Sequence, residues 1–362
     1  MRRRWLAPFV LAQCVACNAL LGIDFDGTER VSGDGGPGPT DDARTDAAST
    51  SDAGDKDVDG GDYLALAEEL RAMRVRVASS PGTASDYFTS KSWLYWNDTQ
   101  GSAKGLRISD GATRAFSTKL IGGNDEVVVV DNVITPSVLD ANTGAVIGEI
   151  PNKNFIASID GKLLYFSQES DPLTGVYQWG PSQSTKLGSV GTAAMSRVMH
   201  DNDVAILETL PTGFVRVSVS PFASVVFPRP YQHFEIAPMP EGIVYSTADG
   251  GPLRILLAKE DGSTTDLKAA IMAATSDIPL SDRTPLLSIG AYGHWLFFTS
   301  GAGILAFRSS DSKLVALQLR LPGERAGYIG LKFVEAAKAL VFSVQPDNEG
   351  LYYLPVAPLL PP

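Results

Sequence analysis

The chain has 362 residues, of which 44% are hydrophobic and 20% are charged, as in a folded protein. Its 35 glycines and 23 prolines indicate many turns between short strands. The formal net charge is −11, and residues 24–62 alone contain twelve acidic and three basic residues. Three arginines at positions 2–4 add +3, so residues 63–362 carry only −5. That region has no basic cluster, which excludes an electrostatic case for nucleic-acid binding.

The first 16 residues have the parts of a secretory signal peptide. Arginines at positions 2–4 form a basic start, an apolar run extends from Trp5 to Ala16, and a small residue precedes Cys17. The apolar run is short and is broken by Pro8, whereas a membrane-spanning helix needs roughly 20 residues. We therefore expect residues 1–16 to be cleaved from the mature chain.

The segment Val15-Ala16-Cys17 resembles the lipobox of bacterial lipoproteins, in which a cysteine after a small residue is linked to diacylglycerol. The family prefers leucine three positions before that cysteine, where this chain has Cys14. The alternative Leu11-Ala12-Gln13-Cys14 has the leucine but places glutamine at the small-residue position. Cys14 and Cys17 are the only cysteines, so cleavage leaves one thiol and no internal disulfide.

The resemblance implies that Cys17 is lipid-modified and that the protein is tethered to a membrane of the cell envelope. By the same analogy, Asn18 after the anchor favours the outer membrane over the inner one. An ordinary signal peptide with two incidental cysteines is the alternative. Both readings predict export.

Residues 17–62 are expected to form the anchor and an acidic, disordered linker. The linker has almost no large apolar residues, so it cannot bury enough surface to offset its ordering entropy. The segment 55–60 (DKDVDG) resembles the start of an EF-hand calcium loop, but Leu66 stands where the bidentate glutamate should be. We therefore predict no metal site here, and a short amphipathic helix over Leu64–Arg71.

Residues 63–362 contain seven copies of one unit, an apolar strand followed by a turn and a second strand. The apolar strands begin 34, 36, 41, 39, 52 and 45 residues apart, at positions 93, 127, 163, 204, 243, 295 and 340. This spacing is typical of four-stranded propeller blades, whose central strands are apolar on both sides because blades stack face to face. The predicted fold is all-β, a single β-propeller of about seven four-stranded blades, with six or eight as alternatives.

Two segments of the repeat region need a separate interpretation. The last unit offers only three strands, and Met73–Ala78 alternates at period two before the first unit, so it can supply the missing outer strand and close the ring. The 52-residue spacing contains Asp266–Thr275, an alanine-rich stretch that predicts a short helix on one face.

The repeat resembles bacterial propellers of the TolB-like and quinoprotein-like (WD40-like) kind. Residues 138–144 (VLDANTG) are similar to the strand-and-turn signature of the quinoprotein repeat, and residues 93–97 (WLYWN) to inner strands of lipoprotein propellers. The tryptophan that follows the glycine in that repeat is absent, and there is no vicinal cysteine pair for a quinone. The resemblance therefore implies the fold, without the dehydrogenase activity or a cofactor.

No residue pattern predicts a catalytic or metal site. The three histidines lack metal-ligand spacing and are interpreted as turn or edge residues: His200 in a hairpin turn, His233, and His294 before Trp295. Aromatic residues are candidates for stacking on sugars or peptides at the ring mouth, although core packing is the simpler interpretation: Trp96, Trp179, Trp295, Tyr352 and Tyr353. Carboxylates near strand starts are candidates for an enzymatic channel site: Glu126, Asp160, Glu208 and Glu241.

The sequence thus favours a membrane-anchored envelope lipoprotein whose propeller is a non-enzymatic binding or scaffold module. Its ligand would be a protein, a peptide or a glycan. The alternative is a propeller-type hydrolase or lactonase with a metal in the central channel, which would require convergent carboxylates.

Overall fold

The computed structural model describes residues 60–79, 87–131, 135–151, 155–170, 173–191, 195–200, 205–209, 213–228, 235–247, 253–274, 285–321, 323–324, 327–345 and 350–360. The predicted signal peptide, Cys17, the linker up to residue 59 and His233 lie outside these residues. Residues 56–362 form one compact unit.

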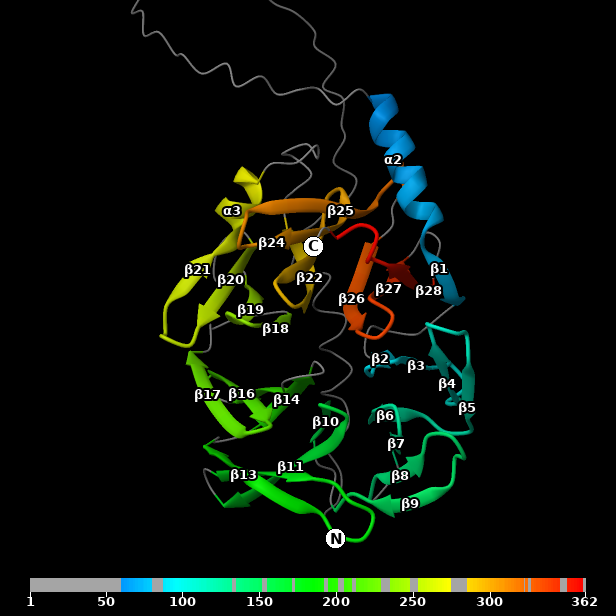
Figure 1. Ribbon diagram of the computed structural model, residues 1–362, viewed down its shortest axis with the longest axis vertical. Coiled ribbons are helices and arrows are strands. Elements are labelled where there is room, and N and C mark those ends of the chain that lie inside the picture. Colours follow the sequence, from blue (N-terminus) through cyan, green and yellow to red (C-terminus); the bar gives the residue numbers. More distant parts are fainter. Residues whose placement is uncertain are drawn as a thin grey trace, which may run out of the picture. The chain divides into compact units, whose positions relative to one another are not determined.

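Seven four-stranded antiparallel sheets are arranged as blades around a centre, which confirms the predicted seven-bladed propeller (Figure 1). Blade 1 consists of β2 (Tyr87–Thr89), β3 (Trp93–Asn97), β4 (Ala103–Arg107) and β5 (Thr113–Phe116). Blade 2 consists of β6 (Leu120–Gly123), β7 (Val127–Val130), β8 (Ser137–Asp140) and β9 (Val146–Glu149). Blade 3 consists of β10 (Phe155–Ile159), β11 (Lys162–Ser170), β12 (Leu173–Gln178) and β13 (Thr185–Gly191).

The remaining blades follow the same order. Blade 4 consists of β14 (Met195–His200), β15 (Ala205–Thr209), β16 (Gly213–Val219) and β17 (Phe222–Pro228). Blade 5 consists of β18 (Ile236–Met239), β19 (Gly242–Thr247), β20 (Arg254–Lys259) and β21 (Thr264–Asp266). Blade 6 consists of β22 (Pro285–Tyr292), β23 (Trp295–Ser300), β24 (Gly303–Arg308) and β25 (Lys313–Leu319). Blade 7 contains β26 (Gly327–Val334), β27 (Ala339–Gln345), β28 (Gly350–Pro355) and the N-terminal strand β1 (Val75–Ala78).

The ring closes between the two ends of the described chain, as the sequence predicts. Strand β1 is the outer strand of blade 7 and pairs antiparallel with β28, with Val75 opposite Tyr353 and Arg76 opposite Tyr352. On the inner side, β2 of blade 1 contacts β26 of blade 7. The Tyr87 hydroxyl donates to the carbonyl oxygen of Gly330 in β26, which joins the same two blades.

Burial falls from the second strand of a blade to the outer strand. Every residue of β3, β19 and β23 is buried, because both faces of these strands pack between neighbouring blades. The outer strand β9 has no buried residue, and its Val146 is 65% exposed. This gradient explains why the second strands dominate the sequence pattern.

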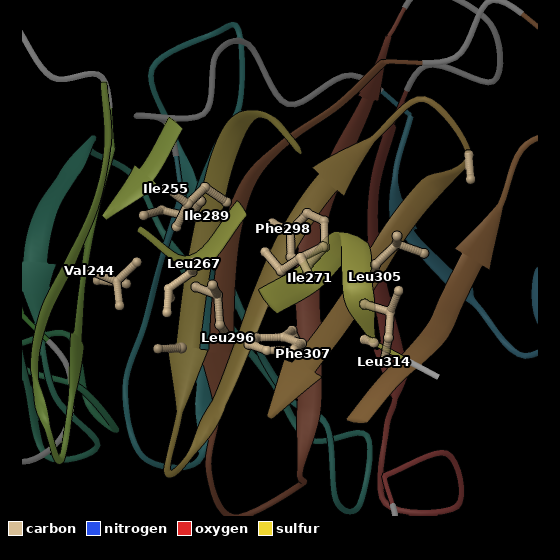
Figure 2. Packing of buried hydrophobic residues seen from close by; sticks show 14 of the residues in the cluster. Val244, Ile255, Leu267, Ile271, Ile289, Leu296, Phe298, Leu305, Phe307 and Leu314 are labelled. Carbon is tan, nitrogen blue, oxygen red and sulfur yellow. The ribbon is translucent and has the colours of Figure 1, made fainter. Parts of the chain in front are cut away.

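Two helices pack against blades 5 and 6. Helix α3 (Leu267–Ala273) begins after Asp266, whose side chain accepts from the Lys268 N–H, as expected for an N-cap. Its Leu267 and Ile271 pack into the core with β23 and β24, beside Phe298 and Phe307 (Figure 2). The predicted helix is confirmed, and it is a structural part of this core.

Helix α2 (Gly60–Ala72) is longer at its start than the predicted Leu64–Arg71. It buries Ala67 and Leu70 against the core of blades 5 and 6, while Leu64 remains 39% exposed. At its last turn, Arg71 pairs with Glu324 in the connection between β25 and β26, at 3.3 Å. Neither described helix is long and apolar enough to cross a membrane.

Candidate ligand-binding site

The turns of each blade alternate between two faces of the ring. In an antiparallel sheet whose strands follow in sequence order, the first-to-second and third-to-fourth turns lie at the same end of the strands. Glu126, Asp160 and Glu241 lie in first-to-second turns on this face, which we call the turn face. Glu208 lies on β15 near the opposite end, so the four predicted carboxylates do not share one face.

The carboxylates of the turn face do not converge on one another. Glu126 is exposed, and Asp160 lies 3.8 Å from Lys162 across its own turn. Within the described residues, no group of three or more His, Cys, Asp or Glu side chains is placed to hold a metal ion.

Glu241 and His294 form a contact that the sequence analysis missed. His294 Nδ1 lies 2.6 Å from Glu241 Oε1, so this pair links the turn faces of blades 5 and 6. His294 precedes β23 in a turn and is 57% exposed in its side chain, instead of lying on a strand edge. His200 is the last residue of β14 and not part of a turn as predicted. One sequence signal could have predicted the Glu241–His294 pair: both residues come directly before the second strand of their blades, and these blades are adjacent.

A cavity of about 250 Å³ opens between blades 6 and 7 on the turn face. Its wall combines ring faces, two cationic side chains and aliphatic groups: Tyr292, Trp295, Arg308, Phe333, Lys338, Val356, Ala357 and Leu360. The rings of Tyr292 and Phe333 stack across the blade boundary with centroids 4.0 Å apart. This lining contains no carboxylate, imidazole, thiol or aliphatic hydroxyl.

Cross-strand pairing places the cation and the indole of this cavity together. Trp295 begins β23 and lies directly opposite Arg308 at the end of β24, and the Arg308 guanidinium carbon is 4.7 Å from the centre of the Trp295 ring. Arg308 also donates to both carboxylate oxygens of Asp311, at 3.0 and 2.8 Å. The guanidinium thereby lowers the pKa of Asp311, and the carboxylate raises the pKa of Arg308.

Blade 1 contains the same arrangement. Trp93 lies opposite Arg107, which stacks at 5.3 Å on the indole and donates to both oxygens of Asp110. In blade 1, however, the Trp93 ring has a second cation over it. The Arg114 guanidinium from β5 lies 3.6 Å from its centre.

Register shows which residue of blade 6 replaces Arg114. Arg114 pairs with Gly105, and in blade 6 the corresponding pair is Val315 with Ala306. Val315 packs in the core between blades 6 and 7, and its short side chain cannot cover the indole as a guanidinium does. The cavity thus lies beside Trp295 where blade 1 has its own arginine beside Trp93.

The last described residues form the outer wall of the cavity. Because β1 supplies the outer strand of blade 7, the segment after β28 is not needed as a strand. It turns back instead, and the N–H groups of Leu359 and Leu360 both lie 2.9 Å from the Val356 carbonyl oxygen. Ring closure by the N-terminal strand therefore allows residues 356–360 to line the cavity.

The predicted aromatic candidates are mostly core residues. Exposure is 9% or less for Trp96, Trp179, Trp295 and Tyr352, which confirms core packing for these four, while Tyr353 is half-buried. Trp295 is the member of this set that also lines the cavity. The sequence named Trp295 with the other four candidates but could not distinguish it from them, because the cavity depends on how blades 6 and 7 pack.

Comparison with known proteins supports the fold. No family model and no curated protein sequence matches the chain. The structure of U3-55K superposes with a TM-score of 0.50 at 12% identity, covering 78% of this chain and 98% of that one. The computationally designed Ika8 protein (TM-score 0.46, 13% identity, 77% and 99% coverage) and BamB from Moraxella catarrhalis (TM-score 0.42, 9% identity, 77% and 83% coverage) also align. The likeness to U3-55K, at 12% identity, shows the propeller architecture alone.

Proposed function

We propose that this protein is a lipid-anchored lipoprotein of the cell envelope whose propeller binds a protein, peptide or glycan without catalysing a reaction. β-Propellers commonly serve as binding or scaffold modules. The observation that carries the proposal is the cavity between blades 6 and 7, whose lining offers ring faces and positive charge to a ligand. The location rests on the lipobox-like segment ending at Cys17 and the acidic linker after it.

The anchor is tested by the intact mass of the protein purified from membranes, beside a Cys17→Ser variant. The proposal expects the wild type to begin at Cys17 with the added mass of diacylglycerol, and expects that mass to be absent from the variant. A wild-type protein with unmodified Cys17 would overturn the lipoprotein assignment and leave a secreted propeller.

The binding role is tested by photo-crosslinking in cells that produce the full chain. A benzophenone amino acid is placed at Ala357, which is exposed on the cavity wall, or at Val226, which is 62% exposed on the outer strand β17. We expect a discrete crosslinked product from position 357 and none from position 226. Identical products from both positions, or none from position 357, would contradict a binding site at this cavity.

A further inference from the structure

The cavity has a filled counterpart within the same molecule, and the comparison defines the shape of its ligand. In blade 1, the Arg114 guanidinium is a planar group stacked 3.6 Å above the Trp93 ring. In blade 6, Val315 replaces this arginine, and space remains beside Trp295. The space therefore suits a flat group that stacks on the Trp295 indole.

The polar groups around the two positions also differ. In blade 1, Arg114 donates to the Asp125 carbonyl oxygen at 3.0 Å and to Asn142 Oδ1 at 2.5 Å. The bond from Ala141 N to Glu126 O in blade 2 corresponds to that from Val356 N to Lys338 O in blade 7.

This correspondence places Lys338 where blade 2 has Glu126, and Ala357 where blade 2 has Asn142. Asn142, which accepts from Arg114, is thus replaced by a methyl group, and the acidic Glu126 is replaced by a cation. Arg308 lies on the same wall but already donates to both carboxylate oxygens of Asp311, so Lys338 supplies the positive charge that a ligand meets in this cavity. A guanidinium or ammonium group is disfavoured here, whereas a planar group with a negative charge beside it is favoured.

The size of the cavity limits how much of a ligand enters it. About 250 Å³ is less than the roughly 300–1,000 Å³ of a site that encloses a whole small molecule. It matches one anchoring residue of a larger partner, as in the buried centre of a protein interface. Because Trp295 is only 7% exposed, the indole forms a slot wall and not an open platform for a sugar ring.

Resting on the proposed binding function, we propose that the cavity receives one aromatic side chain of a polypeptide partner, with acidic residues next to it in the partner's sequence. The aromatic ring stacks on Trp295 beside Tyr292 and Phe333. The neighbouring carboxylates face Lys338.

The test is isothermal titration of the full chain carrying Cys17→Ser with three blocked tripeptides: acetyl-Asp-Tyr-Asp-amide, acetyl-Lys-Tyr-Lys-amide and acetyl-Asp-Leu-Asp-amide. We expect the acidic aromatic peptide to bind about ten-fold more tightly than either of the other two, and its affinity to fall with added salt. Equal affinities for the acidic and basic aromatic peptides would overturn the proposal. Tighter binding of an oligoglucuronate than of the acidic aromatic peptide would overturn the choice of a polypeptide.

Three variants locate the binding. Val315→Arg fills the slot as Arg114 does in blade 1, and Ala357→Trp obstructs it from an exposed position that the fold does not depend on; each should weaken the acidic peptide about ten-fold. Lys338→Asn removes a charge at a left-handed backbone position (φ 44°) that asparagine tolerates, and should reduce the preference for acidic over basic peptide several-fold.

The matched control is Arg114→Val, which removes the guanidinium over Trp93 but keeps Asn142 beside that position, with Glu126 at the place that corresponds to Lys338. It should create no second site for the acidic peptide. Unchanged binding in both Val315→Arg and Ala357→Trp would overturn the proposal. If the crosslink from position 357 persists while the peptides show no charge preference, the ligand chemistry is wrong and the binding function stands.

Discussion

Removing the Tyr87 hydroxyl tests the closure of the ring directly. Tyr87 is 1% exposed, and its hydroxyl donates to the Gly330 carbonyl and lies 3.1 Å from that of Ile329, so it bridges blade 1 and blade 7. Tyr87→Phe keeps the ring and removes this bond, leaving the Gly330 carbonyl oxygen without it. Leaving a buried acceptor unsatisfied costs about 1–3 kcal/mol. We therefore expect the variant to lose about 2 kcal/mol of unfolding free energy.

The assay is urea unfolding followed by tryptophan fluorescence, with the thermal midpoint as a second measure. A loss of about 2 kcal/mol corresponds to a midpoint lowered by roughly 3 °C in a propeller of about 300 residues, because the entropy of unfolding grows with chain length. The control is Tyr165→Phe, since Tyr165 is also buried but its hydroxyl donates to none of the described residues. A loss no larger in Tyr87→Phe than in Tyr165→Phe would refute the bridging role.

Three further changes test other parts of the structure. Burial raises the pKa of Tyr95 and of Tyr328 to about 12, whereas a tyrosine in the unfolded chain ionises near pH 10. Between pH 10 and 12, unfolding therefore releases protons from these two side chains. The urea midpoint should consequently fall as the pH rises from 10 to 12. Glu324→Gln removes the negative charge that pairs with Arg71. The pair is only partly exposed, because the Glu324 side chain is 6% exposed and that of Arg71 is 26% exposed. Calorimetry should therefore show a loss of unfolding free energy between the ~1 kcal/mol of an exposed ion pair and the ~3 kcal/mol of a buried one. Gly303→Ala places a Cβ 2.0 Å from a backbone oxygen at φ 148°, so soluble yield and thermal midpoint should both drop sharply, and a midpoint like that of the wild type would contradict this packing.

The number of blades and the closing strand were predictable because their physical signals are local. Second strands pack on both sides, so they appear in the sequence as continuous apolar runs at a regular spacing. The alternating segment that becomes β1 was recognisable because the last unit lacked a strand. The exact start of α2 was not predictable, since Gly60, Gly61 and Asp62 provide no apolar side chain to indicate a helix in the sequence.

The candidate site was not predictable in the same way. Trp295 and Arg308 are 13 residues apart and meet only through strand register, and the equivalent pair in blade 1 has Arg114 over the indole. The difference depends on Val315 in place of Arg114, a substitution that has no meaning until the two blades are aligned by their pairing. The Glu241–His294 pair likewise depends on how adjacent blades stack.

The most direct test of the central claim, that blade 6 and not blade 1 presents the binding site, uses fluorine NMR of the chain labelled with 5-fluorotryptophan. Four of the five tryptophans lie in the propeller, at positions 93, 96, 179 and 295, and Trp295→Phe assigns the resonance of interest. On titration with acetyl-Asp-Tyr-Asp-amide, the Trp295 resonance should shift while that of Trp93, beneath Arg114, stays in place. Equal shifts of both resonances, or a shift of Trp93 alone, would contradict the account.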